Sequence, residues 1–257
     1  MLPVDYISLE FSAKPGQVAL REITGREEWM VNSVDTLVAI RLLDCLLLDI
    51  PGVTFQPGGV ARLASADRER MLLAVYRRLY GGRVATTLTC QACQVQFDLD
   101  FDLEDVLKAI PAEKLTAGER VNGRDYELPG GVRFRLPTGE DELAIAHLPR
   151  IQAEEALLRR CLIDGEAESE PSVRQAMETI APVVDIDLDC RCPECDRAQT
   201  VRFDLQRYLL AAIQSEQPRL AREVHLLATA YGWKLEEILG LPRSQRRMYV
   251  ALVESAR

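Results

Sequence analysis

Several features that mark common protein classes are scarce in this sequence of 257 residues. It contains two histidines, and it has no phosphate-binding loop, dinucleotide fingerprint or nucleophile elbow. His147 and His225 lie far apart on predicted helices and in no catalytic spacing, so we expect ordinary structural roles for both. The sequence therefore predicts a protein that is not an enzyme and has no small-molecule substrate.

Long hydrophobic runs are also missing. The most apolar stretch, residues 36–50, is too short to cross a bilayer and contains Arg41 and Asp44. The first ten residues include Asp5 and Glu10 and lack the order of charged and then apolar residues that marks a signal peptide. These features predict a soluble, cytoplasmic protein without a membrane partner.

Basic charge is in short supply. The chain has 31 lysines and arginines against 40 aspartates and glutamates, a net charge of -9. Such a chain is poorly suited to follow a phosphate backbone, which needs clustered lysine and arginine, and anionic membranes would repel it. What is present is an ordinary globular composition, with 47% hydrophobic residues, enough for a real core.

The cysteines are the most informative residues. Four of the seven form two CxxC pairs, Cys90 with Cys93 and Cys192 with Cys195. Two CxxC turns can supply the four sulfurs of a tetrahedral zinc site. Four cysteine ligands leave no open position for water, so the pattern predicts one structural zinc ion per chain. The alternatives are four thiols without a metal and a redox-active CxxC, but no thioredoxin-type layout precedes either pair.

The two cysteine regions repeat each other at an offset of 102 residues. The same triplet follows each second cysteine at the same distance, as Phe101-Asp102-Leu103 and Phe203-Asp204-Leu205. We expect both copies to run strand, knuckle, strand and helix, with the aspartate of each triplet as the helix N-cap. The alignment also selects Cys192 rather than its neighbour Cys190 as the metal ligand.

The hydrophobic periodicity around these repeats predicts an α+β fold. Its centre would be a zinc-ribbon-like core built from the two knuckle repeats, with an inserted subdomain of a hairpin and helices, and with flanking helices. An insertion is tolerable because closure entropy grows only slowly with loop length. The predicted parts are a mostly helical N-terminal segment, 1–82; the paired repeats, 83–110 and 185–213; the inserted α/β subdomain, 111–184; and a C-terminal helical segment, 214–257.

Within these parts, some elements and residues are expected in specific places. Helices are predicted at 35–48 and 65–80, and a hairpin at 126–136. Cys45 and Cys161 lie among apolar residues and are expected in the core.

We expect the charged clusters to have structural rather than functional roles. The acidic pair Glu27–Glu28 is expected in a loop. Three aspartates alternate with apolar residues on a predicted strand and are expected to form a solvated face rather than a cation site. An arginine cluster near the C-terminus is expected at a solvated helix start, the alternative being contact with nucleic acid or an acidic partner. These residues are Asp185, Asp187 and Asp189, and Arg243, Arg246 and Arg247.

An apolar stripe in the C-terminal segment has two interpretations. Its members recur at helical spacing and either face a partner or pack against the chain's own core, of which the second is the more frequent arrangement. They are Trp233, Leu235, Ile238 and Leu239.

Three stretches of the chain carry a resemblance to a known family. They are Ala19–Glu28 (ALREITGREE); the helix that begins Ser65-Ala66-Asp67-Arg68 and ends at Tyr80–Gly81; and residues 231–247, which hold YGW, EEIL and LPRSQRR. Together they resemble the T4-type baseplate protein family, whose members are encoded with phage tails and phage-tail-like contractile injection systems. The resemblance implies a non-enzymatic structural or assembly protein of the baseplate, with other baseplate or tail proteins as partners and a place in a phage-like particle.

Two rival functions stay open. The first is a zinc-ribbon module that binds nucleic acid, against which the net charge and the few basic residues beside the knuckles weigh. The second is a zinc hydrolase, which would need an open ligand position and a nearby general base. The sequence also leaves open the oligomeric state, the direct partner, and whether the four cysteines close a site within one chain or between two.

Overall fold

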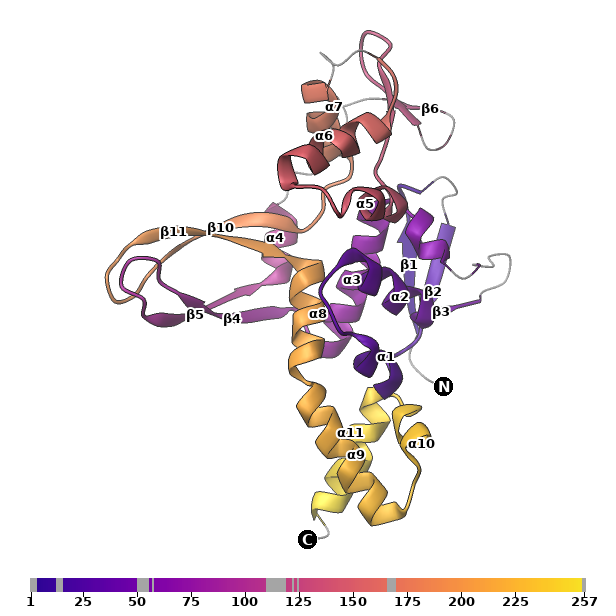
Figure 1. Cartoon of the computed structure of the whole chain (residues 1–257), viewed down its shortest axis with the longest axis vertical. Helices are drawn as coiled ribbons and strands as arrows, with labels where there is room; N and C mark the ends of the chain where they lie inside the picture. Colours follow the sequence, from indigo (N-terminus) through magenta and orange to yellow (C-terminus); the bar gives the residue numbers. More distant parts are fainter. Residues whose placement is uncertain are drawn as a thin grey trace. The chain divides into compact units, whose positions relative to one another are not determined.

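The computed structural model describes residues 4–12, 16–49, 56, 58–109, 119–121, 123, 125–165 and 170–255. These residues form helices and small antiparallel sheets, which confirms the predicted α+β class (Figure 1). They fall into two compact units. The first combines Met1–Leu9, Gly16–Arg62 and Gln206–Arg257, and the second combines Glu10–Pro15 and Leu63–Leu205. Among the described helices, none is long and apolar enough to span a bilayer.

The first unit contains a three-stranded sheet within the segment that was predicted to be mostly helical. The buried side chains of Ile7 and Leu9 alternate with the exposed side chains of Tyr6 and Ser8, so one face of the first strand belongs to the core. The strands pair in the order β1 (Asp5–Leu9), β2 (Gly16–Leu20), β3 (Leu47–Leu48).

Helices make up the rest of the first unit. The predicted helix over 35–48 is present, and the Asp35 carboxylate caps it by accepting the N–H of Val38 at 2.9 Å. A small core of Leu227, Ile238 and Val253 joins the C-terminal helices. The helices are α1 (Gly25–Met30), α2 (Thr36–Leu46), the 3-10 helix η1 (Gly59–Arg62), α8 (Leu205–Ser215), α9 (Gln217–Tyr231), α10 (Leu235–Leu239) and α11 (Arg243–Ser255).

Two expectations about the first unit are wrong. Glu27 and Glu28 lie in helix α1 and not in a loop, because Thr24 and Glu27 form a capping box that starts the helix. The Glu27 carboxylate accepts the backbone N–H of Thr24 at 2.9 Å. Cys45 is exposed rather than buried, whereas Cys161 is buried as predicted.

The second unit mixes helices and strands, both within the predicted insertion and on either side of it. The hairpin over 126–136 is present as two strands of a four-stranded sheet, and the rings of Tyr126 and Phe134 stack with centroids 5.6 Å apart. The elements are α3 (Ser65–Tyr80), β4 (Arg83–Thr89), β5 (Gln96–Asp102), α4 (Leu103–Ala109), β6 (Glu119–Val121), β7 (Asp125–Glu127), β8 (Arg133–Arg135), α5 (Gly139–Ile145), α6 (Arg150–Cys161), β9 (Leu162–Asp164), α7 (Glu170–Ile180), β10 (Asp185–Arg191) and β11 (Ala198–Asp204).

Helix α3 has the predicted bounds, but its first turn does more than start a helix. Its Asp67 carboxylate is fully buried and accepts the backbone N–H groups of Glu10, Phe11 and Ser12. Arg68 forms an ion pair with Glu142 at 2.6 Å. The polar residues of this turn therefore fix neighbouring segments of the second unit.

The predicted grouping of residues 185–213 differs from the observed one. Helix α4, after the first knuckle, belongs to the second unit with its hairpin. Helix α8, after the second knuckle, belongs to the first unit from Gln206 onward. The repeat therefore includes a helix after each hairpin, beginning at Leu103 and at Leu205, but the two helices belong to different units.

Candidate metal centre

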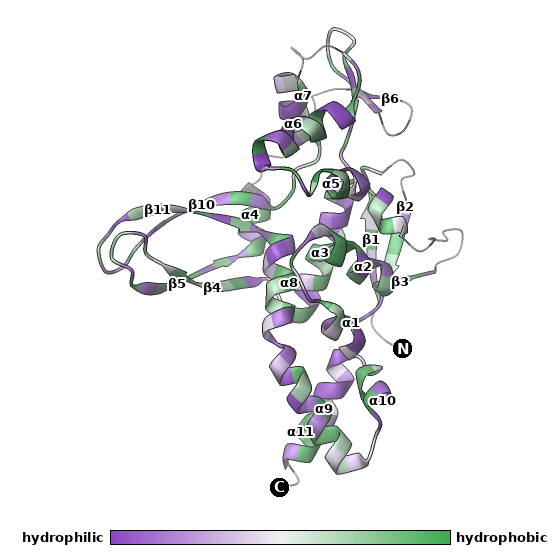
Figure 2. Ribbon diagram, in the orientation of Figure 1, coloured by the Kyte–Doolittle hydropathy of each residue, from purple (hydrophilic) through white to green (hydrophobic). Residues whose placement is uncertain are grey.

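Two long hairpins of the second unit carry the four cysteines (Figure 1). Strands β4 and β5 form one hairpin and β10 and β11 the other, and the first begins at Arg83 and the second at Asp185, 102 residues later. Each is an antiparallel pair of seven-residue strands. Hydrophobic and polar residues alternate along them, as Figure 2 shows. The sequence repeat is thus a structural repeat.

The knuckle at the end of each hairpin has the same backbone. In the first, the Cys90 N–H donates to the Val95 carbonyl at 2.9 Å; in the second, the Cys192 N–H donates to the Arg197 carbonyl at 3.0 Å. The equivalent residues Gln94 and Asp196 have φ values of 60° and 55°. A left-handed residue other than glycine costs about 1–2 kcal/mol, so its recurrence marks a turn that the site requires.

The four sulfur atoms converge on one point. The Sγ atoms of Cys90 and Cys195 lie 3.7 Å apart, as do those of Cys93 and Cys192, and all four lie within 4.8 Å of one another. A tetrahedral ion with bonds of about 2.3 Å to sulfur separates its ligands by about 3.8 Å. A disulfide needs about 2.05 Å. The spacing therefore fits four ligands of one metal ion and no disulfide.

The arrangement has approximate two-fold symmetry. The first cysteine of each knuckle contacts the second cysteine of the other, and the repeat-equivalent rings of Phe101 and Phe203 meet edge to face at 5.1 Å. Each hairpin is closed at its base by an equivalent bond: the N–H of Leu103 donates to Gly82 at 2.8 Å, and that of Leu205 to Val184 at 3.1 Å. All four sulfurs of the cluster come from the same chain.

The electrostatics of the four thiols favour a bound cation. Backbone N–H groups of Cys93 and Ala92 point at the Cys90 sulfur and lower the pKa of that thiol to about 6. The Val95 N–H favours a Cys93 thiolate, but partial desolvation and the three neighbouring sulfurs outweigh it and raise the pKa of Cys93 to about 12. Four thiolates this close would repel one another strongly, and a divalent ion removes that repulsion.

The first and the second cysteine of each CxxC pair differ in their exposure to solvent. Cys90 and Cys192 are buried beside Phe97, whereas Cys93 and Cys195 are exposed. Cys190 lies outside the cluster, and its thiol donates to the Gln199 carbonyl at 3.5 Å. The choice of Cys192 over Cys190 from the sequence repeat therefore agrees with the geometry.

The remaining candidates do not gather into a site. His147 and His225 are exposed on separate units. The aspartates of β10 at 185, 187 and 189 are exposed, as expected of a solvated strand face. In the described part of the chain, the four cysteines are the one group of three or more histidine, cysteine or acidic residues close enough to share an ion.

The arginine cluster is not solvated, contrary to our expectation. Arg243 and Arg246 are 4% and 1% exposed. Both bind the carboxylate of Glu28, each at 2.8 Å. The sequence feature that could have indicated this burial is the presence of both an acidic stretch, GREE, and a basic stretch, RSQRR. A buried charge needs a partner of opposite sign.

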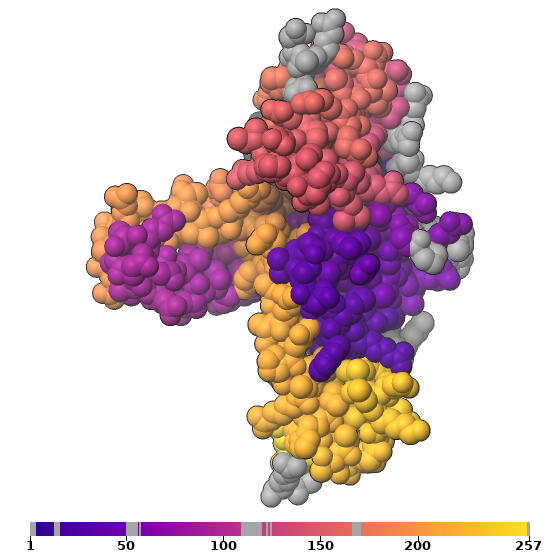
Figure 3. Space-filling view, viewed as in Figure 1, coloured from indigo at the N-terminus to yellow at the C-terminus, as the bar shows by residue number. Residues whose placement is uncertain are grey.

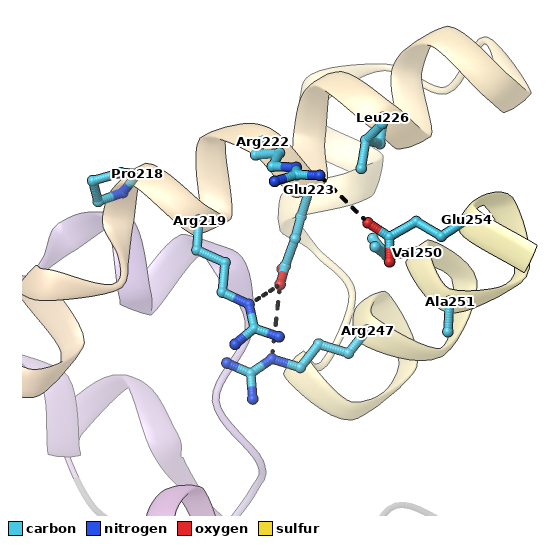
Figure 4. Close-up of a pocket in the computed structure, with 9 residues that line it drawn as sticks. All are labelled: Pro218, Arg219, Arg222, Glu223, Leu226, Arg247, Val250, Ala251 and Glu254. Carbon is cyan, nitrogen blue, oxygen red and sulfur yellow. Dashed lines mark ion pairs between the residues drawn. The ribbon is translucent and has the colours of Figure 1, made fainter.

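Further contacts extend this network in the first unit. Arg246 also binds Glu223 at 2.7 Å, and Arg243 also binds Glu216 at 2.6 Å. Arg247 also forms an ion pair with Glu223, at 3.7 Å (Figure 4). The network therefore joins α1, α9 and α11 through shared carboxylates.

The backbone joins the same two stretches of the chain. The N–H of Arg243 donates to the Ile23 carbonyl at 3.0 Å, and the Glu22 carboxylate accepts from the N–H and the hydroxyl of Ser244. Two of the three stretches that carry the family resemblance thus form one continuous piece of structure.

The apolar stripe near the C-terminus is split between core and surface. Ile238 is completely buried, and Trp233 is partly buried against Tyr249 with ring centroids 5.0 Å apart. Leu235 is 56% exposed and Leu239 is partly buried. The four side chains therefore do not form one exposed face.

Comparisons of the chain with models of protein families, with curated proteins and with solved structures find no match.

Proposed function

We propose that the four cysteines hold one structural zinc ion and that the two hairpins form a ribbon-like core around it. The sulfur spacing of 3.7 Å within each contacting pair carries this proposal, because it matches a tetrahedral four-sulfur site. All four positions are filled by protein ligands, so the ion has no place for a reactive water. Its role is to hold together two segments that are far apart in the chain.

Metal analysis of the purified chain tests this assignment. We expect one zinc ion per chain. Iron is the main competitor for four cysteine ligands, and its thiolate site would absorb visible light. A preparation that contains iron, or that is fully folded without metal, would contradict the zinc assignment.

We propose further that the protein is a non-enzymatic structural or assembly component of the baseplate of a phage tail or contractile injection system. The observation that carries this is the meeting of residues 19–28 and 241–247, which resemble the baseplate family, in one buried ion-pair network. These charges bind one another inside the protein, as expected of a scaffold rather than of a catalytic centre. A closed metal centre is in keeping with the same role.

Co-purification from the native host tests the baseplate role. A tagged chain is separated into large particles and soluble protein by sedimentation, and the proteins that travel with it are identified. Recovery in particles with tail and baseplate proteins would make it a structural component. Recovery in the soluble fraction with baseplate precursors would make it an assembly factor. Recovery with neither, or with nucleic acid instead, would refute the proposal.

The alternative of a nucleic-acid-binding ribbon finds little support in the hairpins. Asp98 and Asp100 line β5, and Arg191 beside the second knuckle is paired with Asp196. Acidic strands repel a phosphate backbone. A salt-dependent gel shift with DNA or RNA would be needed to favour this function over a scaffold.

A further inference from the structure

A groove of about 930 Å³ runs beside β10 in the second unit. Its walls come from α6 and α7 on one side and from β10 on the other, with the start of α3 between them. Figure 3 shows the surface of this region, where the helices at residues 150–180 meet the orange strand β10. The groove is separate from the cysteine cluster, none of whose residues line it.

The lining of the groove identifies which part of β10 faces it. Four consecutive residues line it, Asp185 to Leu188. Because successive side chains of a strand point to opposite faces, four in a row that border one hollow place part of it along the strand's edge, while Arg202 of β11 borders another part. Strand β10 pairs with β11 on its other side, and no other described strand pairs with it. The groove thus runs along an open edge with unpaired backbone groups.

The helical wall of the groove contains an apolar strip between charged residues. Leu157, Met177 and Ala181 border it and are only partly buried, while Leu158 is buried behind them. On the strand side, Ile186 and Leu188 are also partly buried. A strand placed against this edge would bury alternate apolar side chains while its backbone bonds to β10, which is the usual mode of strand addition.

The charges at the groove indicate which kind of peptide segment it would bind. Its lining contains five acidic residues and three arginines, and one of the acidic residues, Glu142, is paired with Arg68 outside the lining, so the excess negative charge is one. The arginines are occupied: Arg202 binds Asp185, while Arg150 and Arg174 share Glu154. Among the described residues Glu178 has no ion-pair partner. The unbalanced charge therefore favours a basic occupant.

We propose that this groove binds an extended, basic segment of a partner protein by strand addition to β10, with alternate apolar side chains against α6 and α7. A second copy of this chain is a poorer occupant. Pairing of β10 with β10 would bring two rows of aspartates, at 185, 187 and 189, side by side, and like charges across a strand pair are destabilising. The binding proposed does not depend on the baseplate role or on the identity of the metal.

A peptide panel tests the proposal with the full-length chain. The probe is a fluorescent peptide of four residues, the length of the part of β10 that lines the groove, with alternating lysine and valine. A second peptide replaces lysine with glutamate. A third keeps the lysines but carries N-methyl groups on the backbone along one edge, so that it keeps the charge and loses the donors. We expect binding of the first, and binding of the other two that is weaker by about tenfold or more.

Matched variants locate the site. Asp187→Lys and Leu157→Glu, which alter the groove, should each weaken binding by about tenfold. Asp189→Lys on the same strand and Ile151→Glu on the same helix lie outside the groove and should leave it unchanged. Hydrogen exchange should slow at the β10 amides when peptide binds, and circular dichroism checks the fold of every variant.

Several results would overturn the proposal. One is the absence of binding at millimolar peptide, and another is equal affinity for the N-methylated peptide, which would mean attraction by net charge alone. Equal effects of Asp187→Lys and Asp189→Lys would move the site off the groove. Sedimentation that shows a dimer dissociated by Asp187→Lys would make a second copy the occupant instead.

Discussion

Arg246 and Glu28, which lie 218 residues apart in the chain, form a buried ion pair with 2.8 Å between Nη2 and Oε2. Their side chains are 1% and 4% exposed. Arg246 also binds Glu223, and Glu28 also binds Arg243. Each charge is therefore compensated more than once, which is the condition under which a buried ion pair is tolerated.

Removal of Arg246 should destabilise the protein severely. In Arg246→Ala, Glu28 and Glu223 lose a buried partner, and we expect a loss of about 3–5 kcal/mol in the free energy of unfolding. Urea denaturation measures it. Arg222→Ala is the control, because Arg222 is 75% exposed and pairs with Glu254 at 3.8 Å. That change should cost less than about 1 kcal/mol. Similar losses in the two variants would argue against a structural network.

Substitution of single cysteines should separate ligands from bystanders. Cys93→Ser removes one of the four clustered sulfurs, so we expect most of the metal to be lost and the unfolding midpoint to fall. Cys190→Ser changes a thiol two residues from a ligand but outside the cluster, and it should keep the full metal content. Metal analysis and thermal unfolding provide the two readouts. Retention of metal by Cys93→Ser would rule out the four-ligand site.

The Glu69 carboxyl should make the protein less stable at alkaline pH. Burial, with the nearby charge of Asp204, raises the pKa of the Glu69 carboxyl to about 8. Between the ordinary pKa of about 4.5 and this value, the folded state holds a proton that the unfolded chain has released, so stability falls as pH rises. Above about pH 8 this contribution is constant at its lowest value.

The neutral analogue tests this dependence. Glu69→Gln should be more stable than the parent at about pH 9, by on the order of 2 kcal/mol, and the difference should vanish near about pH 4. Urea denaturation across this range measures it. Glu155→Gln, at an exposed position of α6, is the control and should leave the pH profile unchanged. A constant difference between Glu69→Gln and the parent at all pH values would exclude titration of Glu69 as its source.

Replacement of Gly25 by alanine should destabilise the protein, although alanine usually stabilises a helix. Alanine is the better helix former, but a Cβ at Gly25 would lie 2.9 Å from Leu239 Cδ2 and 3.1 Å from the Leu239 Cα. We expect Gly25→Ala to destabilise the protein by about 1–3 kcal/mol through overpacking. In Gly82→Ala, a Cβ would meet nothing closer than 3.7 Å, so its cost should be smaller. Thermal unfolding of both variants gives the comparison, and equal costs would contradict a tight contact at Gly25.

The cluster of four cysteines was predictable because the sequence features that specify it are local and repeated. A CxxC turn points two thiols the same way whatever surrounds it, and the repeat at 102 residues identified the matching pair and excluded Cys190. Helix α3 and the hairpin over 126–136 were predictable for the same reason, since caps, turns and hydrophobic periodicity lie within each segment.

The errors concern residues whose environment is set by distant parts of the chain. Glu28 and Arg246 read as solvated charges in isolation, and only their meeting across 218 residues allows both to be buried. The sheet that joins β2 to β3 likewise depends on a short strand whose partner lies 27 residues away, as in the pair Leu20 and Leu47.

The sequence by itself determined the four cysteines that cluster, the two hairpins and the main helices, because these follow from the short-range geometry of the backbone and from a repeat in the sequence. The tertiary structure decided that the ends of the chain share one unit, that the arginines of α11 are buried, and that the edge of β10 borders a groove. These features depend on contacts between segments that are distant in the sequence, because such contacts bury charges and border open strand edges. The hydrophobic periodicity of a single segment does not predict contacts of this kind.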